Sequence, residues 1–162
     1  MQKLVVGLAL AGLLVAAGAG IAAGDGGTAE EARAMLERAV AAIEADEAAA
    51  LAAFTAGADG FRDRDLYVAC SSAADGTVTA HGANPGLVGQ RIYDLTDAAG
   101  KRFGEEIHAV AADGEFRVVE YVWPRPGETE AVPKATYVTK VNEQSASSAT
   151  TGKSAQLLPT SR

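Results

Sequence analysis

A few polar and aromatic residues of this sequence could together bind a small anion. Lys134 is the best cationic candidate, because it lies next to Pro133 at the start of a stretch that is typical of a strand. A bound anion would hold its ammonium group in place through charge-assisted hydrogen bonds. The alternative is an exposed strand lysine, since lysine is rarely buried without a partner.

Aromatic side chains supply candidate walls for such a site. Tyr67, Tyr121 and Tyr137 each fall within a stretch that is typical of a strand. Because alternate strand residues face the same side, Tyr121 and Trp123 are expected to share a face. A pocket for a small carboxylate needs a few convergent donors on an otherwise apolar wall, and tyrosine offers both. The alternative for each is a core aromatic residue whose polar tip is satisfied within the protein.

One histidine lies where it could face a ligand. His81 closes a predicted strand just before the Asn84-Pro85 loop. It could donate a hydrogen bond to a ligand, and it would respond to mild acid. The alternative is a loop histidine that bonds to the backbone. Arg91 and Arg102 are weaker anion candidates, for which a solvated surface position is favoured.

Metal binding and catalysis are not favoured. The two histidines, His81 and His108, and the one cysteine, Cys70, do not have the spacing of metal ligands. Cys70 lies in an apolar run, where a thiol is expected to be inert, and Ser71 and Ser72 lack a G-x-S-x-G motif. We expect no catalytic residue, metal or cofactor, and a protein that is not an enzyme. The net charge of −7 also argues against a nucleic-acid partner.

The elements that must position these residues form a single α+β domain. The chain has 162 residues, and 48% of them are hydrophobic, which is enough for one core. Thr28 and Glu31 have the spacing of a helix capping box, and Asp75-Gly76 is a strong hairpin turn signal. The expected order is a long helix from Thr28 to about Phe54, strands Leu66 to Ser72 and Thr77 to His81, a short helix from Ala98 to Ala111, and strands Phe116 to Trp123 and Val132 to Val141.

The first 23 residues are typical of an export signal. Lys3 precedes an uncharged run from Leu4 to Ala16, and small residues follow it. Cleavage after Ala19 or Ala23 would release a periplasmic or secreted protein with no stable membrane span. The alternative is a retained anchor, because the segment is just long enough to cross a bilayer.

The order of motifs resembles the single Cache domain, a family of extracytoplasmic sensor domains with a PAS-like sheet. The resemblance covers about Thr28 to Val141 and rests on the tracts DLYVACSSAADG, TAHGANPGLVGQ, DLTDAAGKRFGEEI, EYVWPRPG and PKATYV. It implies an α+β fold with a long N-terminal helix packed on an antiparallel sheet. It also implies a pocket on one sheet face, closed by the segment between the central strands.

The resemblance implies a periplasmic module that binds a small molecule, most simply a small organic acid. Nothing after Val141 could span a bilayer, so a free module is expected rather than part of a membrane receptor. The alternative is a structural or accessory envelope protein that keeps the fold without a ligand. A weak homodimer through the Thr28 to Phe54 helix is also expected, because its Ala-rich faces allow close approach.

The end of the chain departs from the family. Residues 142–162 are rich in Ser, Thr, Ala and Gln without a period, which is typical of a disordered tail. The family closes with a strand carrying a Cys, a Gly and paired Tyr. Codons permitted for Ser145 to Gly152, read in a shifted frame, encode Cys-Val-Val-Gly-Tyr-Tyr-Arg. The hypothesis is therefore a frameshifted tail, with the preceding strand left as an edge and Cys70 left without a disulfide partner; the DNA tests it.

Overall fold

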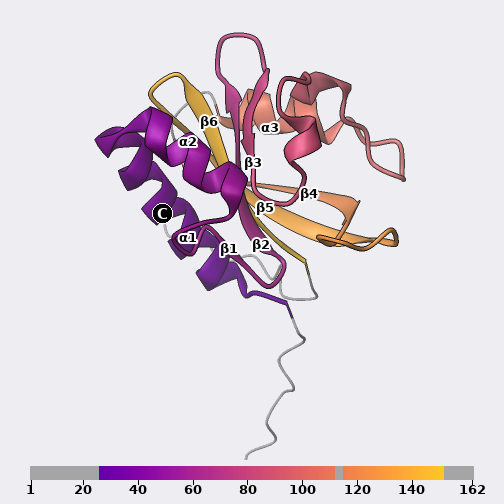
Figure 1. The fold of residues 1–162 in the computed structure, drawn as a ribbon. Helices are drawn as coiled ribbons and strands as arrows, with labels where there is room; N and C mark the ends of the chain where they lie inside the picture. The colour runs from indigo at the N-terminus through magenta and orange to yellow at the C-terminus, as the bar shows by residue number, and fades with distance from the viewer. Residues whose placement is uncertain (1–25, 112–114, 152–162) are drawn as a thin grey trace, which may run out of the picture.

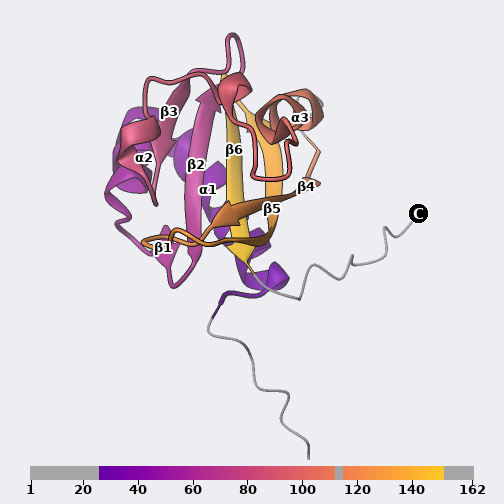
Figure 2. The ribbon, with the colours of Figure 1, turned by 90° about the vertical axis from the view of Figure 1, so that its right-hand side faces the viewer.

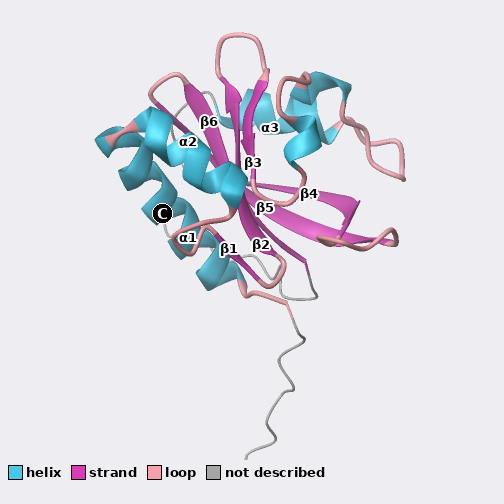
Figure 3. Ribbon diagram, viewed as in Figure 1, coloured by secondary structure: helices cyan, strands magenta, loops and turns pink. Residues whose placement is uncertain are grey.

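Three helices surround one antiparallel sheet in the computed structural model, which describes residues 26–111 and 115–151 (Figures 1 and 3). The helices are α1 (Ala29–Ala45), α2 (Glu47–Ala56) and α3 (Phe103–Ala111). Short 3-10 helices cover Pro85–Leu87 and Ile92–Asp94. The strands are β1 (Arg62–Asp63), β2 (Leu66–Ser72), β3 (Val78–His81), β4 (Arg117–Pro124), β5 (Ala131–Val141) and β6 (Gln144–Thr151).

The sheet brings the two ends of the described chain together. Its order is β1-β2-β6-β5-β4, and β3 also pairs with β2. Figure 2 shows β6 between β2 and β5, with α1 behind them. Cys70 of β2 is opposite Ala146 of β6, and Lys134 of β5 is opposite Tyr121 of β4. Because side chains alternate between faces, this register decides which residues can meet.

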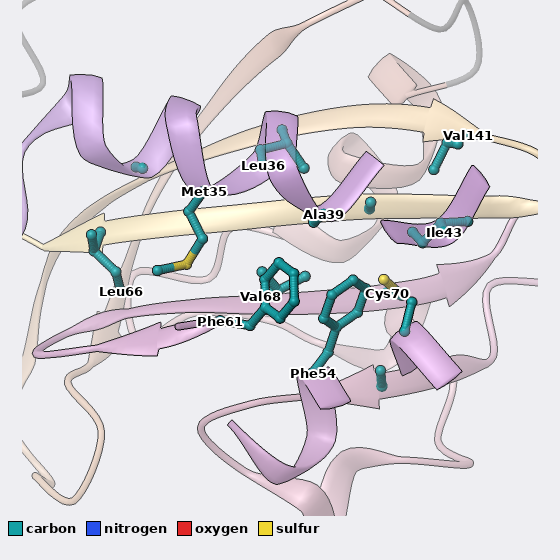
Figure 4. Packing of buried hydrophobic residues seen from close by; sticks show 14 residues of the cluster. Met35, Leu36, Ala39, Ile43, Phe54, Phe61, Leu66, Val68, Cys70 and Val141 are labelled. Carbon is teal, nitrogen blue, oxygen red and sulfur yellow. The ribbon is translucent and has the colours of Figure 1, made fainter. Parts of the chain in front are cut away.

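One face of the sheet packs against α1 and α2. Thr28 caps α1 by accepting a hydrogen bond from the backbone of Glu31, whose side chain accepts from the backbone of Thr28 in return, so the predicted capping box is confirmed. Figure 4 shows the resulting core, in which side chains of α1 meet those of β2 and neighbouring segments. Its members include Met35, Leu36, Ala39, Ile43, Phe54, Leu66, Val68 and Cys70. This face is therefore filled by hydrophobic packing.

The predicted long helix is interrupted. Asp46 has an extended backbone conformation, with φ −159° and ψ 96°, and it separates α1 from α2. Its side chain accepts a hydrogen bond from Ala49 N and so caps α2. An apolar pattern with one break allows a continuous helix, but an Asp side chain can also compete for the backbone and start a new one. The chain changes direction here, and α2 runs back over the sheet (Figure 1).

The other face of the sheet packs against α3 and the segment before it. Phe103 and Ile107 of α3 lie against Val119 and Val138. Gly104 allows this approach, because a Cβ atom there would lie 1.7 Å from the carbonyl oxygen of Ile92. The helix begins later than the predicted Ala98.

Asp97 holds the segment before α3 on the sheet. Its carboxylate accepts hydrogen bonds from the backbone N–H groups of Ala99, Lys101 and Val122. These bonds, the one from Val122 first, lower the pKa of Asp97. The segment is thereby tied to β4.

The prediction of a disordered tail from residue 142 is wrong for residues 144–151. These residues form β6, which pairs with β2 on one side and β5 on the other. Ala146 is fully buried, and Gln144 hydrogen-bonds both Thr79 and Glu47. The composition of this segment predicts disorder. However, the edges of β2 and β5 form backbone hydrogen bonds with it, and these outweigh its weak intrinsic preference for the strand conformation.

The expected unprotected edge at β5 is therefore also wrong, because β6 covers that edge. The shifted reading frame itself concerns the DNA and stays a prediction. So does the export signal, because residues 1–23 lie outside the described residues. Within residues 26–111 and 115–151, no helix has the length and apolar character needed to cross a membrane.

Candidate functional site

A cavity of about 40 Å³ lies on the sheet face that is turned toward α3. Four residues of β2 line it, of which Tyr67, Ala69 and Ser71 occupy alternate positions and Cys70 lies between the last two. Val78 and His81 of β3 and Tyr121 of β4 complete the strand side, and the opposite wall consists of Ile92, Leu95, Phe103 and Ile107. Since a single water needs roughly 10–15 Å³, the cavity suits a molecule of a few heavy atoms.

Lys134 is buried beside this cavity and contacts Tyr67, one of the residues that line it. Only 2% of its surface is exposed, and its Nζ donates a hydrogen bond of 2.6 Å to Tyr67 Oη. Nζ also lies 4.2 Å from the centre of the Tyr67 ring. Burial lowers the pKa of Lys134, although Tyr121 and Asp65 oppose that shift. The alternative of an exposed strand lysine is excluded by this position.

Tyr67 and Tyr121 provide two hydroxyl groups beside Lys134. Because an ammonium group can only donate, Tyr67 Oη accepts from it, and the phenolic hydrogen can be offered to a ligand. Tyr121 Oη lies 2.9 Å from Thr136 Oγ1, and its ring stacks on Phe103 at a centroid distance of 4.0 Å. Burial raises the pKa of both tyrosines, that of Tyr121 to about 12, so both remain protonated at neutral pH.

His81 is held in one orientation by the loop that follows it. Its Nδ1 accepts hydrogen bonds from the backbone N–H groups of Ala83 (3.3 Å) and Asn84 (3.0 Å). Accepting at Nδ1 places the hydrogen of the neutral ring on Nε2. The ring also packs against Tyr67, with centroids 5.0 Å apart. Burial, and then the charge of Lys134, lower the pKa of His81 to about 4.

Trp123 lies beside the cavity rather than in its lining. It is partly buried and meets the edge of Phe103 at 5.1 Å between ring centroids. Tyr121 contacts the same ring, so the two residues share a face as their spacing predicts. Trp123 thus supports the wall that Phe103 presents to a ligand.

Tyr137 does not belong to the cavity, and its predicted place there is corrected. Lys134 and Thr136 of β5 are turned toward the Tyr67 and Tyr121 hydroxyl groups. Tyr137 directly follows Thr136 in the strand, so its side chain faces the opposite side of the sheet. There it packs against the core under α1. Burial, and then Glu30, raise the pKa of Tyr137.

Several residues in or beside the cavity were not predicted. Ser71 lines the cavity and shares a strand face with Tyr67, while Thr136 shares a strand face with Lys134 and contacts Tyr121. The period-two spacing of strands could have found both. Phe103, Ile92 and Leu95 come from the connecting segment and α3. Their arrangement depends on the packing of that segment, for which the local sequence has no periodic signal.

A larger and more polar cleft of about 360 Å³ is a weaker candidate. It lies near the β1–β2 turn and the β4–β5 hairpin and includes Arg64, Arg125 and Glu128. Arg64 forms ion pairs of 2.8 Å with both Glu31 and Asp63, and Arg125 forms one of 3.5 Å with Glu128. Since these charges are neutralised by their neighbours, the cavity beside Lys134 is the better candidate.

Comparison with known proteins identifies the fold. The family model described as Single Cache domain 2 matches residues 26–144. The chain belongs to this family. The predicted single Cache domain with a PAS-like α+β fold is therefore confirmed, and no curated protein gives a significant match to the chain.

Several solved structures have a similar fold. A methyl-accepting chemotaxis protein from Vibrio parahaemolyticus RIMD 2210633 has a TM-score of 0.61 and 22% identity, with 74% of this chain and 85% of that chain covered. A periplasmic sensor domain of a chemotaxis protein has a TM-score of 0.57 and 28% identity, with 74% and 87% covered. A Cache chemosensory domain described for its carboxylic acid recognition has a TM-score of 0.57 and 23% identity, with 74% and 85% covered.

Proposed function

We propose that this Cache domain binds a small organic acid in the cavity beside Lys134, outside the cytoplasm, and that it acts by binding rather than by catalysis. The carboxylate would lie against Lys134 Nζ, the hydroxyl groups of Tyr67 and Tyr121, and Nε2–H of His81. The short tail would lie against the apolar wall that includes Ile92, Leu95 and Phe103.

The burial of the Lys134 amino group against Tyr67 is the observation that carries the proposal. A lysine with 2% exposure has lost its hydration, and a neutral phenol only partly replaces it. The buried carboxylate of Asp65 favours the charged form of Lys134, but the hydrogen bond of Nζ goes to the neutral Tyr67 hydroxyl group. A ligand carboxylate would place a negative charge in direct contact with Nζ, together with short charge-assisted hydrogen bonds.

The relatives support this class of ligand and this location. One structural neighbour is described for carboxylic acid recognition, and another as a periplasmic sensor domain. Tyr67, Tyr121 and His81 are polar members of a small cavity lining that is otherwise largely apolar, which is the usual composition of selective small-molecule sites. Three hydrogen-bond donors and one cation fit a single carboxylate.

A ligand screen tests the proposal directly. Thermal unfolding is followed in the presence of acetate, propionate, butyrate, pyruvate, lactate and succinate, with chloride at equal ionic strength as the control. A bound acid raises Tm, since ligand affinity adds to the free energy of unfolding. If none of these acids shifts Tm, the alternative of an accessory envelope protein without a ligand replaces the proposal.

Lys134→Met is expected to lower the affinity for the acid about ten- to a hundredfold, because a hydrogen bond to a charged group typically contributes about 1.5–3 kcal/mol. Thermal unfolding of the free variant checks that it is folded, since the buried Tyr67 hydroxyl group loses its hydrogen-bond partner. Calorimetric titration measures the affinity. Tyr137→Phe, on the opposite face of the same strand, is the matched control and should bind as wild type. Equal affinity of Lys134→Met and wild type would reject the site.

A further inference from the structure

Ser71 places a buried hydroxyl group without a partner in the apolar part of the cavity. Its exposed fraction is 1%, and its Oγ has no hydrogen-bond partner among the described residues. Buried polar groups are nearly always hydrogen-bonded, so an exception at a cavity wall calls for a missing partner. Two other threonine hydroxyl groups of the sheet are satisfied: that of the buried Thr136 by Tyr121, and that of the partly buried Thr79 by Gln144.

The strand geometry at Ser71 is irregular. The pairing of β2 with β3 shifts register between Cys70 and Ser71, and Ser71 is then opposite Val78. Such bulges re-aim a side chain and are common beside binding sites. Around the cavity, Val78, Ile92, Leu95 and Ile107 offer no side-chain hydrogen-bond partner. The Ser71 hydroxyl is therefore a single polar group in an apolar environment.

The adjacent serine shows that a hydroxyl group without a partner is not a general feature of this strand. Ser72 is half-buried, and its Oγ accepts a hydrogen bond from Ala74 N. His108 Nδ1 also lacks a partner among the described residues, but His108 packs on the ring of Tyr93 and is not part of the cavity wall. Ser71 is the case that faces the proposed ligand.

The register also gives the distance at which a ligand would meet Ser71. His81 is opposite Ala69, and Ser71 lies two residues further along β2. Two residues of a strand span roughly 7 Å. A ligand whose carboxylate lies near His81 and Lys134 would therefore reach Ser71 with the far end of its tail rather than with a substituent beside the carboxylate.

We propose that Ser71 determines ligand specificity by hydrogen-bonding a hydroxyl or carbonyl oxygen at the far end of the ligand. This inference rests on the proposed binding of a small organic acid. It narrows the ligand to acids that carry a second oxygen function away from the carboxylate, and it predicts that plain fatty acids of the same length bind more weakly.

Matched pairs of acids test the inference by calorimetric titration. Propionate is compared with lactate and 3-hydroxypropionate, and butyrate with 2- and 4-hydroxybutyrate, so that each chain length has its own reference. Wild type is expected to bind the terminally hydroxylated acid about three- to tenfold more tightly than the plain acid, the usual range for one neutral hydrogen bond. The 2-hydroxy acids should show no such gain.

Ser71→Ala is expected to abolish the preference for the terminal hydroxyl group, so that the plain and the terminally hydroxylated acid of each chain length bind this variant with affinities within about twofold of each other. Ser72→Ala is the matched control and should keep the preference. Thermal unfolding checks that Ser71→Ala is folded. If wild type binds plain and terminally hydroxylated acids equally, or if Ser71→Ala keeps the preference, the inference is wrong while the proposed function stands. If wild type binds no acid, the proposed function fails and the inference fails with it.

Discussion

His81 combines a structural role with a place in the cavity wall. Its Nδ1 accepts from two backbone N–H groups of the following loop, and its ring packs on Tyr67. The sequence left two roles open for His81, a histidine that faces a ligand and a histidine that bonds to the loop backbone. The side chain combines a bond to the loop backbone with a position in the cavity wall. Accepting through Nδ1 requires the neutral ring, so protonation at Nδ1 would break the contact that orients the loop.

The stability of the domain should consequently fall in mild acid. The pKa of His81 is lowered to about 4 in the folded state, against about 6.5 in an unfolded chain. The unfolded state therefore binds a proton first as pH falls, and stability is lost between about pH 7 and pH 4. The contribution of His81 between pH 7.5 and pH 5 is roughly 2 kcal/mol.

Chemical unfolding at several pH values measures this effect. His81→Asn keeps a side-chain acceptor near the loop but cannot titrate. The loss of stability of this variant between about pH 7.5 and pH 5 should therefore be smaller than that of wild type, and the difference should equal about the contribution of His81. Parallel pH profiles of wild type and His81→Asn would contradict the assignment of a neutral, buried His81.

At the residue scale, the sequence predicted the kinds of residue better than their orientation. Lys134 and Tyr121 were found because their types and strand positions suit an anion site, and they meet in the cavity region. Tyr137 is also a strand tyrosine, but it lies at an odd-numbered position of β5 and so faces away from the cavity. The sequence alone does not show which face of the strand is turned toward α3. Ser71 is not part of any motif, and its unpartnered hydroxyl becomes visible only in three dimensions.

At the scale of elements, β6 is the least expected part of the fold. Its sequence, QSASSATT, has few residues with a strong strand preference, but it pairs along both sides. The helix break at Asp46 was missed for a related reason. In both places, tertiary contacts decide between local conformations that the sequence leaves close in energy.

The register of β6 allows a direct test of its position. Cys70 and Ala146 are opposite each other and are both buried in the core under α1. Directly paired residues of antiparallel strands have Cα atoms about 4.5–5.5 Å apart, which is within the range that a disulfide spans. Ala146→Cys should therefore form a disulfide with Cys70 and stabilise the domain by about 2–4 kcal/mol under oxidising conditions.

Thermal unfolding with and without reductant measures the gain, and free-thiol titration reports bond formation. Ala135→Cys is the matched control, because it adds a thiol at another buried strand position that is opposite Thr150 rather than a cysteine. Two free thiols in oxidised Ala146→Cys would place β6 in another register.

At the scale of the whole molecule, the two sheet faces have separate roles. The α1 and α2 face is a hydrophobic core that includes Cys70, whose thiol pKa is raised by burial. The opposite face holds the cavity. The order of most strands followed from turn signals and alternation, whereas the insertion of β6 between β2 and β5 did not, because long-range pairing has no local signature. The predicted homodimer through α1 stays a prediction.

Removing β6 should abolish the fold, since β2 and β5 would lose the strand that joins them. A chain ending at Glu143 is expected to lack cooperative thermal unfolding and to be rapidly degraded by protease. A chain ending at Thr151, which keeps all the described strands, is the control and should unfold cooperatively. Cooperative unfolding of the shorter chain would show that the sheet closes without β6.

The central position of β6 also bears on when the protein can fold during its synthesis. Translation delivers β2 and β5 before β6, and β5 reaches β2 only through β6. The sheet therefore cannot close until residues 144–151 have left the ribosome, and the nascent chain has no complete native core before then. For a chain expected to carry an export signal, such a delay would keep it extended enough to be threaded through a membrane before it folds.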